Sequence, residues 1–131
     1  MDQPLPPLAA VVGFIDAINR GDLERLGRLM TEAHRLQILD EPPVEGREAN
    51  IRAWRGYMTS FPRYVIHPER LAASGSRVAV LGSTTGSHLG LPDQEELRLS
   101  VIWVATAVRG KLDSWQIVQD SPDQREALGL A

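Results

Sequence analysis

The chain has 131 residues, of which 43% are hydrophobic and 24% are charged, and its formal net charge is −3. These values are typical of one globular domain spanning residues 1–131. The sequence has no dense basic run, which argues against a nucleic-acid partner. It also has no cysteine, which excludes disulfides, thiolate chemistry and cysteine–zinc sites.

The N-terminal stretch MDQPLPPLAAVVGF carries an acid and prolines where a signal peptide would carry a basic leader. No apolar run approaches the ~18 residues that a membrane-spanning helix needs. The sequence therefore predicts a cytoplasmic protein that has no membrane partner.

Two helices are predicted at the start of the chain. Apolar residues recur at helical spacing from Leu8 to Ile18. Asp22 is a suitable N-cap for a second short helix over Leu23–Met30. The next four residues, 31–34, are predicted as a link.

The stretch LQILDEPPVEGRE predicts a short strand that runs into an acidic corner. Leu36, Ile38 and Asp40 alternate on one face of this strand, so parity directs Asp40 toward the interior. The residues alone leave open whether Asp40 or Glu41 faces a cavity. The structural alternative is that the acid at this corner accepts hydrogen bonds from backbone N–H groups of its own turn.

A third helix is predicted between Gly46 and Pro62. Its inward stripe consists of Ile51, Trp54, Tyr57, Met58 and Phe61. Beyond this helix the apolar period changes to two, which predicts a strand beginning at Tyr64 and long strands over Arg77–His88 and Glu96–Val108.

A hairpin at Arg109–Lys111, a last strand and a short C-terminal helix complete the chain, and Ser121 and Gln124 form a capping box for that helix. Helices that are segregated from a run of antiparallel strands predict an α+β fold. In this fold a curved sheet packs on the three helices of the N-terminal half. Gly82 and Gly86 lie within a predicted strand, where glycine is typical of a bend or a close approach.

Three segments in this order, FIDAINRGDLERL, ILDEPPVEGREANIRAW and VRGKLDSWQIVQD, resemble the nuclear transport factor 2-like superfamily. Within it, SnoaL-like and ketosteroid-isomerase-like proteins are the most similar, and the resemblance covers roughly Leu8 to Ser121. It implies a cone-shaped α+β fold with a pocket at its open end and a homodimer formed across the sheet. The superfamily hosts isomerases, cyclases, hydrolases, dehydratases and binding modules, so fold alone does not select a function.

The resemblance to ketosteroid isomerases implies a carboxylate base assisted by a tyrosine and a protonated acid. The base position falls at Asp40 or Glu41, and parity favours Asp40 as the candidate catalytic base. Phe14, which has no hydroxyl, occupies the tyrosine position, and the acid position falls near Ile102 or Trp103. Because a phenyl ring cannot donate to an enolate, the ketosteroid isomerase reaction itself is not expected.

Asp120 is a second candidate base, because it closes the last strand where epoxide-hydrolase-like or SnoaL-like cyclase chemistry would place an acid. The hydrolase set of two acids and an arginine is incomplete around Arg98. The structural alternative for Asp120 is the start of the C-terminal helix, where the helix dipole favours an acid.

Aromatic and histidine side chains are the candidates for lining a ligand pocket. The structural alternative is core packing for the aromatic residues and an exposed position at a loop entry for His88. These candidates are Phe14, Trp54, Tyr57, His88 and Trp103. His34 and His67 have no ligand-like spacing, so neither a metal nor another cofactor is expected.

Two functional hypotheses remain. One is a cofactor-independent isomerase, hydrolase or cyclase that uses Asp40 to act on a small apolar or carbonyl-bearing molecule. The other is a non-catalytic module for small-molecule binding or dimeric assembly, in which the acids are structural. A homodimer is expected in addition, since the outward apolar residues Leu81, Ile102 and Val104 would be exposed on a monomer.

Overall fold

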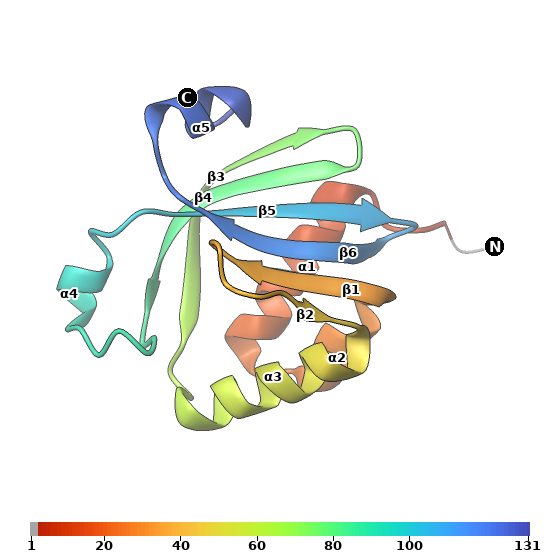
Figure 1. The fold of residues 1–131 in the computed structure, drawn as a ribbon, viewed down its shortest axis with the longest axis horizontal. Coiled ribbons are helices and arrows are strands. Elements are labelled where there is room, and N and C mark those ends of the chain that lie inside the picture. The colour runs from red at the N-terminus through yellow and green to blue at the C-terminus, as the bar shows by residue number, and fades with distance from the viewer. Residues whose placement is uncertain (1–2) are drawn as a thin grey trace.

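The computed structural model describes residues 3–131 as helices packed on a curved, unclosed sheet (Figure 1). The helices are α1 (Pro7–Arg20), α2 (Leu23–Arg28), α3 (Arg47–Ser60), α4 (Asp93–Glu96) and α5 (Pro122–Ala127). The strands are β1 (Met30–Ile38), β2 (Val44–Glu45), β3 (Val65–Ser74), β4 (Arg77–Thr85), β5 (Val101–Val108) and β6 (Lys111–Val118). This arrangement confirms the predicted α+β cone.

The strands form one sheet in the order β2-β1-β6-β5-β4-β3. β1 and β6 run parallel, and every other neighbouring pair is antiparallel. The parallel pair places Leu36 beside Trp115, and the β5–β6 pair places Trp103 beside Ile117. Side chains from β1, β5 and β6 therefore meet on one face of the sheet, although β1 is far from the other two strands in the sequence.

The bend predicted from glycine is present in β4. A Cβ added at Gly82 would lie 2.3 Å from the carbonyl oxygen of His67, so only glycine permits this approach of β4 to β3. The register between these two strands shifts between Pro68 and Arg70. Gly86 has φ 69°, and a Cβ there would lie 2.3 Å from the Arg63 carbonyl oxygen. Both close approaches help to give the long β3–β4 pair its curvature.

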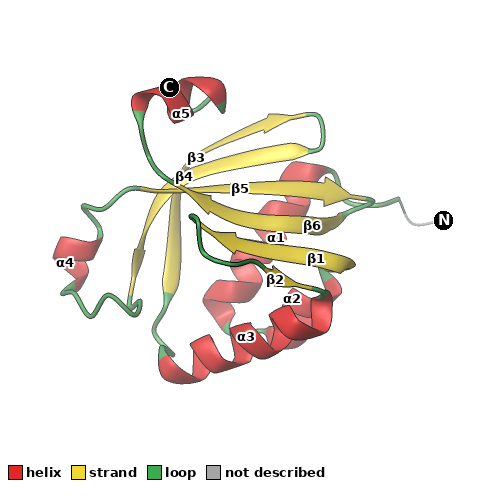
Figure 2. Ribbon diagram, viewed as in Figure 1, coloured by secondary structure: helices red, strands yellow, loops and turns green. Residues whose placement is uncertain are grey.

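The two faces of the sheet are covered by different helices (Figure 2). One set of alternating side chains packs with α1 and α3 in the main core: Val78, Val80, Trp103, Ala105 and Trp115. The opposite set packs with the C-terminal segment in a second core: Ala79, Leu81, Ile102, Leu128 and Leu130. The expectation that Leu81 and Ile102 are exposed on a monomer is wrong, because Leu128 and Leu130 cover them.

The predicted helices are confirmed, with capping as expected. Asp22 accepts a hydrogen bond from the backbone N–H of Arg25 at 3.0 Å, and Ser121 accepts one from the backbone N–H of Gln124 at 3.1 Å. The second helix ends at Arg28, earlier than predicted. Within residues 3–131, no helix is both long and apolar enough to cross a membrane.

The first strand differs from its prediction at both ends. The segment 31–34, predicted as a link, belongs to β1, which begins at Met30. β1 then ends at Ile38, because Leu39 adopts the left-handed conformation with φ 50° and reverses the chain direction. Alternation therefore does not continue to Asp40, and the prediction that Asp40 shares a face with Ile38 is wrong.

The strand predicted over Glu96–Val108 begins only at Val101. Glu96 is instead the last residue of the short helix α4, which has Pro92 at its N-cap position. The leucines at positions 97 and 99 are exposed. The strand predicted to end at His88 ends at Thr85, because Gly86 has a positive φ. Residues 86–100 thus form an excursion beyond the sheet, which carries His88 and Glu96 (Figure 1).

Candidate functional site

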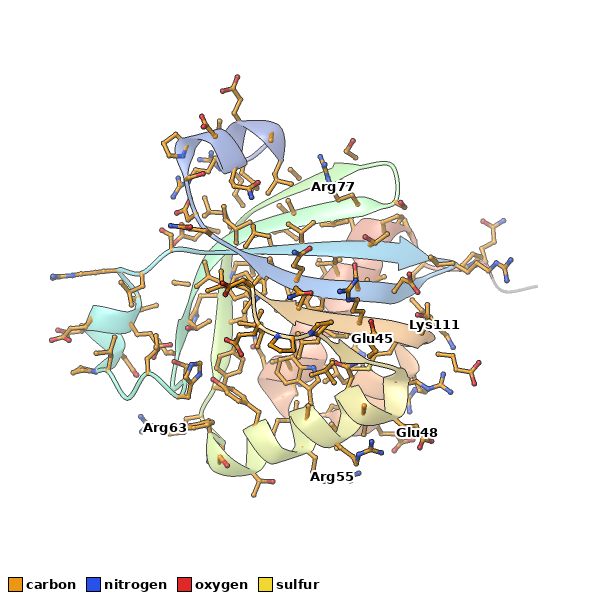
Figure 3. The ribbon with its side chains drawn as sticks, in the orientation of Figure 1. Glu45, Glu48, Arg55, Arg63, Arg77 and Lys111 are labelled. Atoms are coloured by element: carbon orange, nitrogen blue, oxygen red, sulfur yellow. The ribbon has the colours of Figure 1, made fainter. Side chains whose placement is uncertain are left out.

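A cavity of about 270 Å³ lies between α3 and the sheet. Its lining residues are almost all apolar or aromatic: Leu36, Ile38, Val44, Ala53, Trp54, Tyr57, Tyr64, His88, Trp103, Trp115 and Ile117. Figure 3 shows that Glu48 and Arg55 extend from α3 away from the sheet, so the charged side of this helix lies outside the cavity. The site is therefore a largely apolar hollow.

Helical and strand periodicity together bring these side chains to one place. Trp54 and Tyr57 are three residues apart, which puts them on one face of α3. On the sheet, Trp103 of β5 and Trp115 of β6 stack with ring centroids 6.2 Å apart and planes 23° apart. On β1, Leu36 and Ile38 are two residues apart, so both side chains lie on the sheet face that lines the cavity.

Tyr57 is the centre of an aromatic cluster at one end of the cavity. Its ring centroid lies 4.8 Å from that of Phe61, 5.0 Å from that of Tyr64 and 6.2 Å from that of Trp54. Aromatic pairs in such arrangements each contribute about 0.5–1.5 kcal/mol beyond area burial. The cluster therefore gives the cavity a rigid wall.

Two indole N–H groups of the lining have no hydrogen-bond partner among the described residues. They are Nε1 of Trp54 and Nε1 of Trp103, and both atoms are buried. An unmade hydrogen bond on a buried donor costs about 1–3 kcal/mol. Both indole rings belong to the cavity lining, so these two N–H groups are unpartnered donors within its wall.

Tyr57 and His88 form a hydrogen-bonded pair at the cavity. Tyr57 Oη lies 2.9 Å from His88 Nδ1, and the backbone N–H of His88 donates to Tyr57 Oη at 3.2 Å. Burial raises the pKa of the Tyr57 hydroxyl above its usual range. Burial likewise raises the pKa of Tyr64, so both phenols keep their protons at neutral pH and are able to donate.

Glu96 holds the loop that carries His88. Its side chain is buried, it accepts a short hydrogen bond from the Thr84 hydroxyl, and it accepts one from the backbone N–H of Ser87 at 3.4 Å. Burial acts to raise the pKa of Glu96, but the hydrogen bonds from Thr84 and Ser87 outweigh it and lower the pKa. The carboxylate therefore anchors α4 to the end of β4, directly beside His88.

Comparison with protein families gives one match, to the family described as "SnoaL-like domain", over residues 11–115. The chain belongs to the SnoaL-like domain family. A comparison with curated proteins found no match.

Several solved structures share this SnoaL-like fold. A cystatin-fold protein from Novosphingobium aromaticivorans is 18% identical with a TM-score of 0.75, covering 88% of this chain and 99% of its own. A proposed polyketide cyclase from Sinorhizobium meliloti is 21% identical with a TM-score of 0.70 and covers 86% and 94%. A proposed ketosteroid isomerase from Kribbella flavida is 21% identical with a TM-score of 0.67 and covers 93% and 86%. At these identities the similarity concerns fold alone.

Four of the predicted lining residues of this SnoaL-like protein lie together: Trp54, Tyr57, His88 and Trp103 all line the cavity. Phe14 does not. It is fully buried on α1, with its ring centroid 5.7 Å from that of His34 and 5.0 Å from that of Trp115. Phe14 therefore does not line the cavity itself, but it packs against Trp115, which does.

Asp40 lies in the turn after β1 and is exposed. It borders a separate surface groove together with Leu39 and Gln116, and it is not part of the cavity lining. Glu41 is exposed as well. The corner is held instead by Asn50, whose Nδ2 donates to three backbone carbonyl oxygens, those of His34, Val44 and Gly46, at 3.1, 3.0 and 2.8 Å.

Asp120 is the partner of Arg125. The Arg125 Nε and Nη2 groups donate to the two carboxylate oxygens at 2.7 Å each. This bidentate bond lowers the pKa of Asp120 below its usual value. Both side chains border a groove beside α5, apart from the cavity.

The residues that sequence reasoning missed are Tyr64, Glu96 and His34. Tyr64 directly precedes β3, and nothing in the sequence pairs it with Tyr57. Glu96 has the signature of an ordinary charged loop. His34 is fully buried and its Nδ1 donates to the Leu112 carbonyl oxygen at 2.6 Å, which nothing in its neighbouring sequence signals. Within the part of the chain that the structure describes, no three His, Cys, Asp or Glu side chains are grouped as metal ligands.

Proposed function

We propose that this SnoaL-like protein binds a small, largely apolar molecule carrying an oxygen acceptor in the cavity between α3 and the sheet. The size of the cavity supports a guest of one or two rings. Its volume of about 270 Å³ lies just below the ~300–1,000 Å³ typical of pockets for drug-sized ligands. A four-ring steroid would extend out of it.

The observation that carries this proposal is the pair of buried indole N–H groups without partners, on Trp54 and Trp103. Each donor is one of the few polar groups in an otherwise apolar lining, which is the usual composition of a small-molecule site. A carbonyl oxygen is an acceptor that suits both donors.

Calorimetric titration with two matched naphthalenes tests the proposal. 2-Acetonaphthalene carries a carbonyl group, and 2-ethylnaphthalene has a similar shape without it. We expect the ketone to bind, and to bind up to about tenfold more tightly than the hydrocarbon, because one hydrogen bond contributes about 0.5–1.5 kcal/mol. Equal affinities would remove the acceptor from the proposal, and the absence of ketone binding would overturn it.

A variant at the cavity lining locates the binding. Ala53 lines the cavity and is exposed, so Ala53→Trp places an indole at the entrance with little disturbance of the core. Arg52 is the preceding residue on α3, is also exposed and does not line the cavity. We expect Ala53→Trp to weaken ketone binding at least about tenfold while Arg52→Trp retains it.

A carboxylate-base enzyme is the second candidate function. The family and the two similar structures named for cyclase and isomerase activity favour it. Its test is turnover on steroid enones, epoxides and polyketide-like ketones by the unaltered protein and by Asp40→Asn. A large loss in the variant would support Asp40 as the base, and equal activity would exclude it. The position of Asp40 outside the cavity favours the binding proposal.

A further inference from the structure

The cavity lining contains a proton-transfer group that is not a carboxylate. Among the lining residues, the ionisable side chains are Tyr57, Tyr64 and His88, and no Asp or Glu of residues 3–131 is part of the lining. Histidine is the side chain whose charge ordinarily changes between pH 5 and 8. Any acid–base chemistry near neutral pH on a molecule in this cavity would therefore fall to His88.

His88 is held in place by contacts with two aromatic residues of α3 and its C-terminal end. Besides the two hydrogen bonds to Tyr57 Oη, its ring meets those of Tyr57 and Phe61 edge to face, with centroids 5.7 Å and 6.1 Å away. The phenol oxygen contacts both Nδ1 and the backbone N–H of the same residue. Two separate bonds to one residue fix both the ring and the main chain relative to Tyr57.

The acid–base role requires one of the two proton positions on the His88 ring. If Nδ1 carries the proton, it donates to Tyr57 Oη together with the backbone N–H of His88. The phenol then accepts two bonds, which leaves its own O–H free to donate into the cavity and makes it a stronger donor. Nε2 of His88 is then unprotonated and is the free base.

The charged and titratable groups around His88 are consistent with this role. Glu96, which lies in the same excursion, carries a carboxylate already hydrogen-bonded by Thr84 and Ser87. Tyr57 on α3 and Tyr64, directly before β3, line the same cavity as His88, and both are neutral phenols at neutral pH.

We propose that His88 and Tyr57 act as an acid–base pair on the molecule bound in the cavity, with His88 Nε2 as the base and the Tyr57 O–H as the donor. This rests on the proposed binding function. For a ketone, Nε2 removes a proton from the carbon next to the carbonyl, and the C–H electron pair forms the C=C bond of an enol. The C=O π electrons meanwhile move to the carbonyl oxygen, which takes the Tyr57 proton. Return of both protons regenerates the ketone, so the pair catalyses reversible enolisation without a co-reactant.

A general probe of such a base is 5-nitrobenzisoxazole, a two-ring compound that suits the size of the cavity. A base removes its ring C–H proton, the C–H electrons form a nitrile, and the N–O bond breaks to release a coloured phenolate. We expect measurable turnover by the unaltered protein at neutral pH. We expect His88→Gln to lower kcat/KM about 100-fold, and Tyr57→Phe to lower it about tenfold.

His67→Gln is the matched control, because His67 lies on β3 outside the cavity, where its Nε2 contacts the Thr85 hydroxyl at 2.9 Å. We expect its turnover to be unchanged. Circular dichroism and thermal unfolding of each variant separate loss of fold from loss of the base. Long-range ¹H–¹⁵N correlation spectra report which His88 nitrogen carries the proton, and a proton on Nε2 would overturn the assignment of that atom as the base.

The outcomes distinguish this pair from the binding proposal. Binding of 2-acetonaphthalene without turnover of the probe would overturn the acid–base pair and leave the binding proposal intact. Turnover that survives His88→Gln would place the base elsewhere and overturn the pair as well. Absence of both binding and turnover would overturn the binding proposal, and the pair with it.

Discussion

Glu96 is the fully buried acid among those that the structure describes. Its replacement by alanine removes the acceptor of the Thr84 hydroxyl and of the Ser87 N–H, and leaves both donors without a partner. We expect Glu96→Ala to lower the free energy of unfolding by about 1–3 kcal/mol in urea titrations. Glu95→Ala, at the exposed neighbouring position, should stay within about 0.5 kcal/mol of the unaltered protein, and equal effects at both positions would contradict the role of Glu96.

The same carboxylate gives a pH dependence with a definite sign. Its pKa is lower in the folded protein than the ordinary 4.5, because the hydrogen bonds from Thr84 and Ser87 outweigh burial. The stabilisation from this shift is therefore present above pH 4.5 and is lost as the pH falls through the folded pKa. Relative to Glu96→Gln, the unaltered protein should keep a constant advantage above pH 5 and lose it in acid. A difference that grows in acid would contradict the assignment.

A substitution at Trp54 tests whether the ligand accepts a hydrogen bond from the indole N–H of this residue. Trp54→Phe keeps an aromatic side chain on α3 and removes a buried N–H that has no partner in the described chain. If the ketone accepts from this donor, the variant should lose part of the preference for 2-acetonaphthalene over 2-ethylnaphthalene, up to about tenfold. Calorimetry of both ligands checks this, and a preference that is unchanged would exclude Trp54 as the donor.

The end of β1 shows how one backbone angle moves a candidate residue out of a site. Leu39 has φ 50°, a conformation that costs an L-residue about 1–2 kcal/mol and costs glycine almost nothing. Leu39→Gly should stabilise the fold by up to about 1 kcal/mol after the extra freedom of glycine in the unfolded chain is subtracted. The control is Leu97→Gly, since Leu97 is similarly exposed but has φ −61°, and it should destabilise. Thermal unfolding of the two variants decides between them.

The sequence predicted those elements whose signal is local. The stripe of α3 placed Trp54 and Tyr57 on one face, and the capping box at Ser121 placed the start of α5. Alternation failed where the chain leaves the sheet: Leu97 has the parity of Trp103 but lies exposed in the excursion, and Asp40 has the parity of Ile38 but follows a left-handed residue. The period of the apolar residues alone does not show where the chain turns out of a strand.

Four lining residues were predictable from the sequence, whereas the hydrogen bonds between elements were not. The Tyr57–His88 bond joins α3 to the excursion after β4, and the bond between Glu96 and Thr84 closes that excursion on itself. Such contacts depend on tertiary placement, which no spacing in the chain encodes. The pocket-lining aromatics were therefore recognisable from the sequence, whereas the partners that orient them were not.

At the scale of the whole molecule, the C-terminal segment changes the argument for a homodimer. That argument rested on an apolar outer sheet face, and Leu81 and Ile102 of this face are covered by Leu128 and Leu130. The Arg70 Nη1 group also donates to the Leu130 carbonyl oxygen at 2.8 Å, which ties the segment to β3. The homodimer stays a prediction, and it no longer has the support of these two residues.

Removal of the apolar cover should expose the same face to a second copy. We expect Leu128→Ser/Leu130→Ser to lower the free energy of unfolding by about 2–5 kcal/mol, because Leu130 is fully buried and Leu128 nearly so. We also expect the variant to associate more strongly than the unaltered chain in sedimentation velocity at matched micromolar concentrations, since the uncovered patch is apolar. Ala127→Ser, on the exposed side of α5, should change neither quantity. If the double variant sediments and unfolds like the unaltered protein, the C-terminal segment is not the cover of this face, and the original case for dimerisation through Leu81 and Ile102 returns.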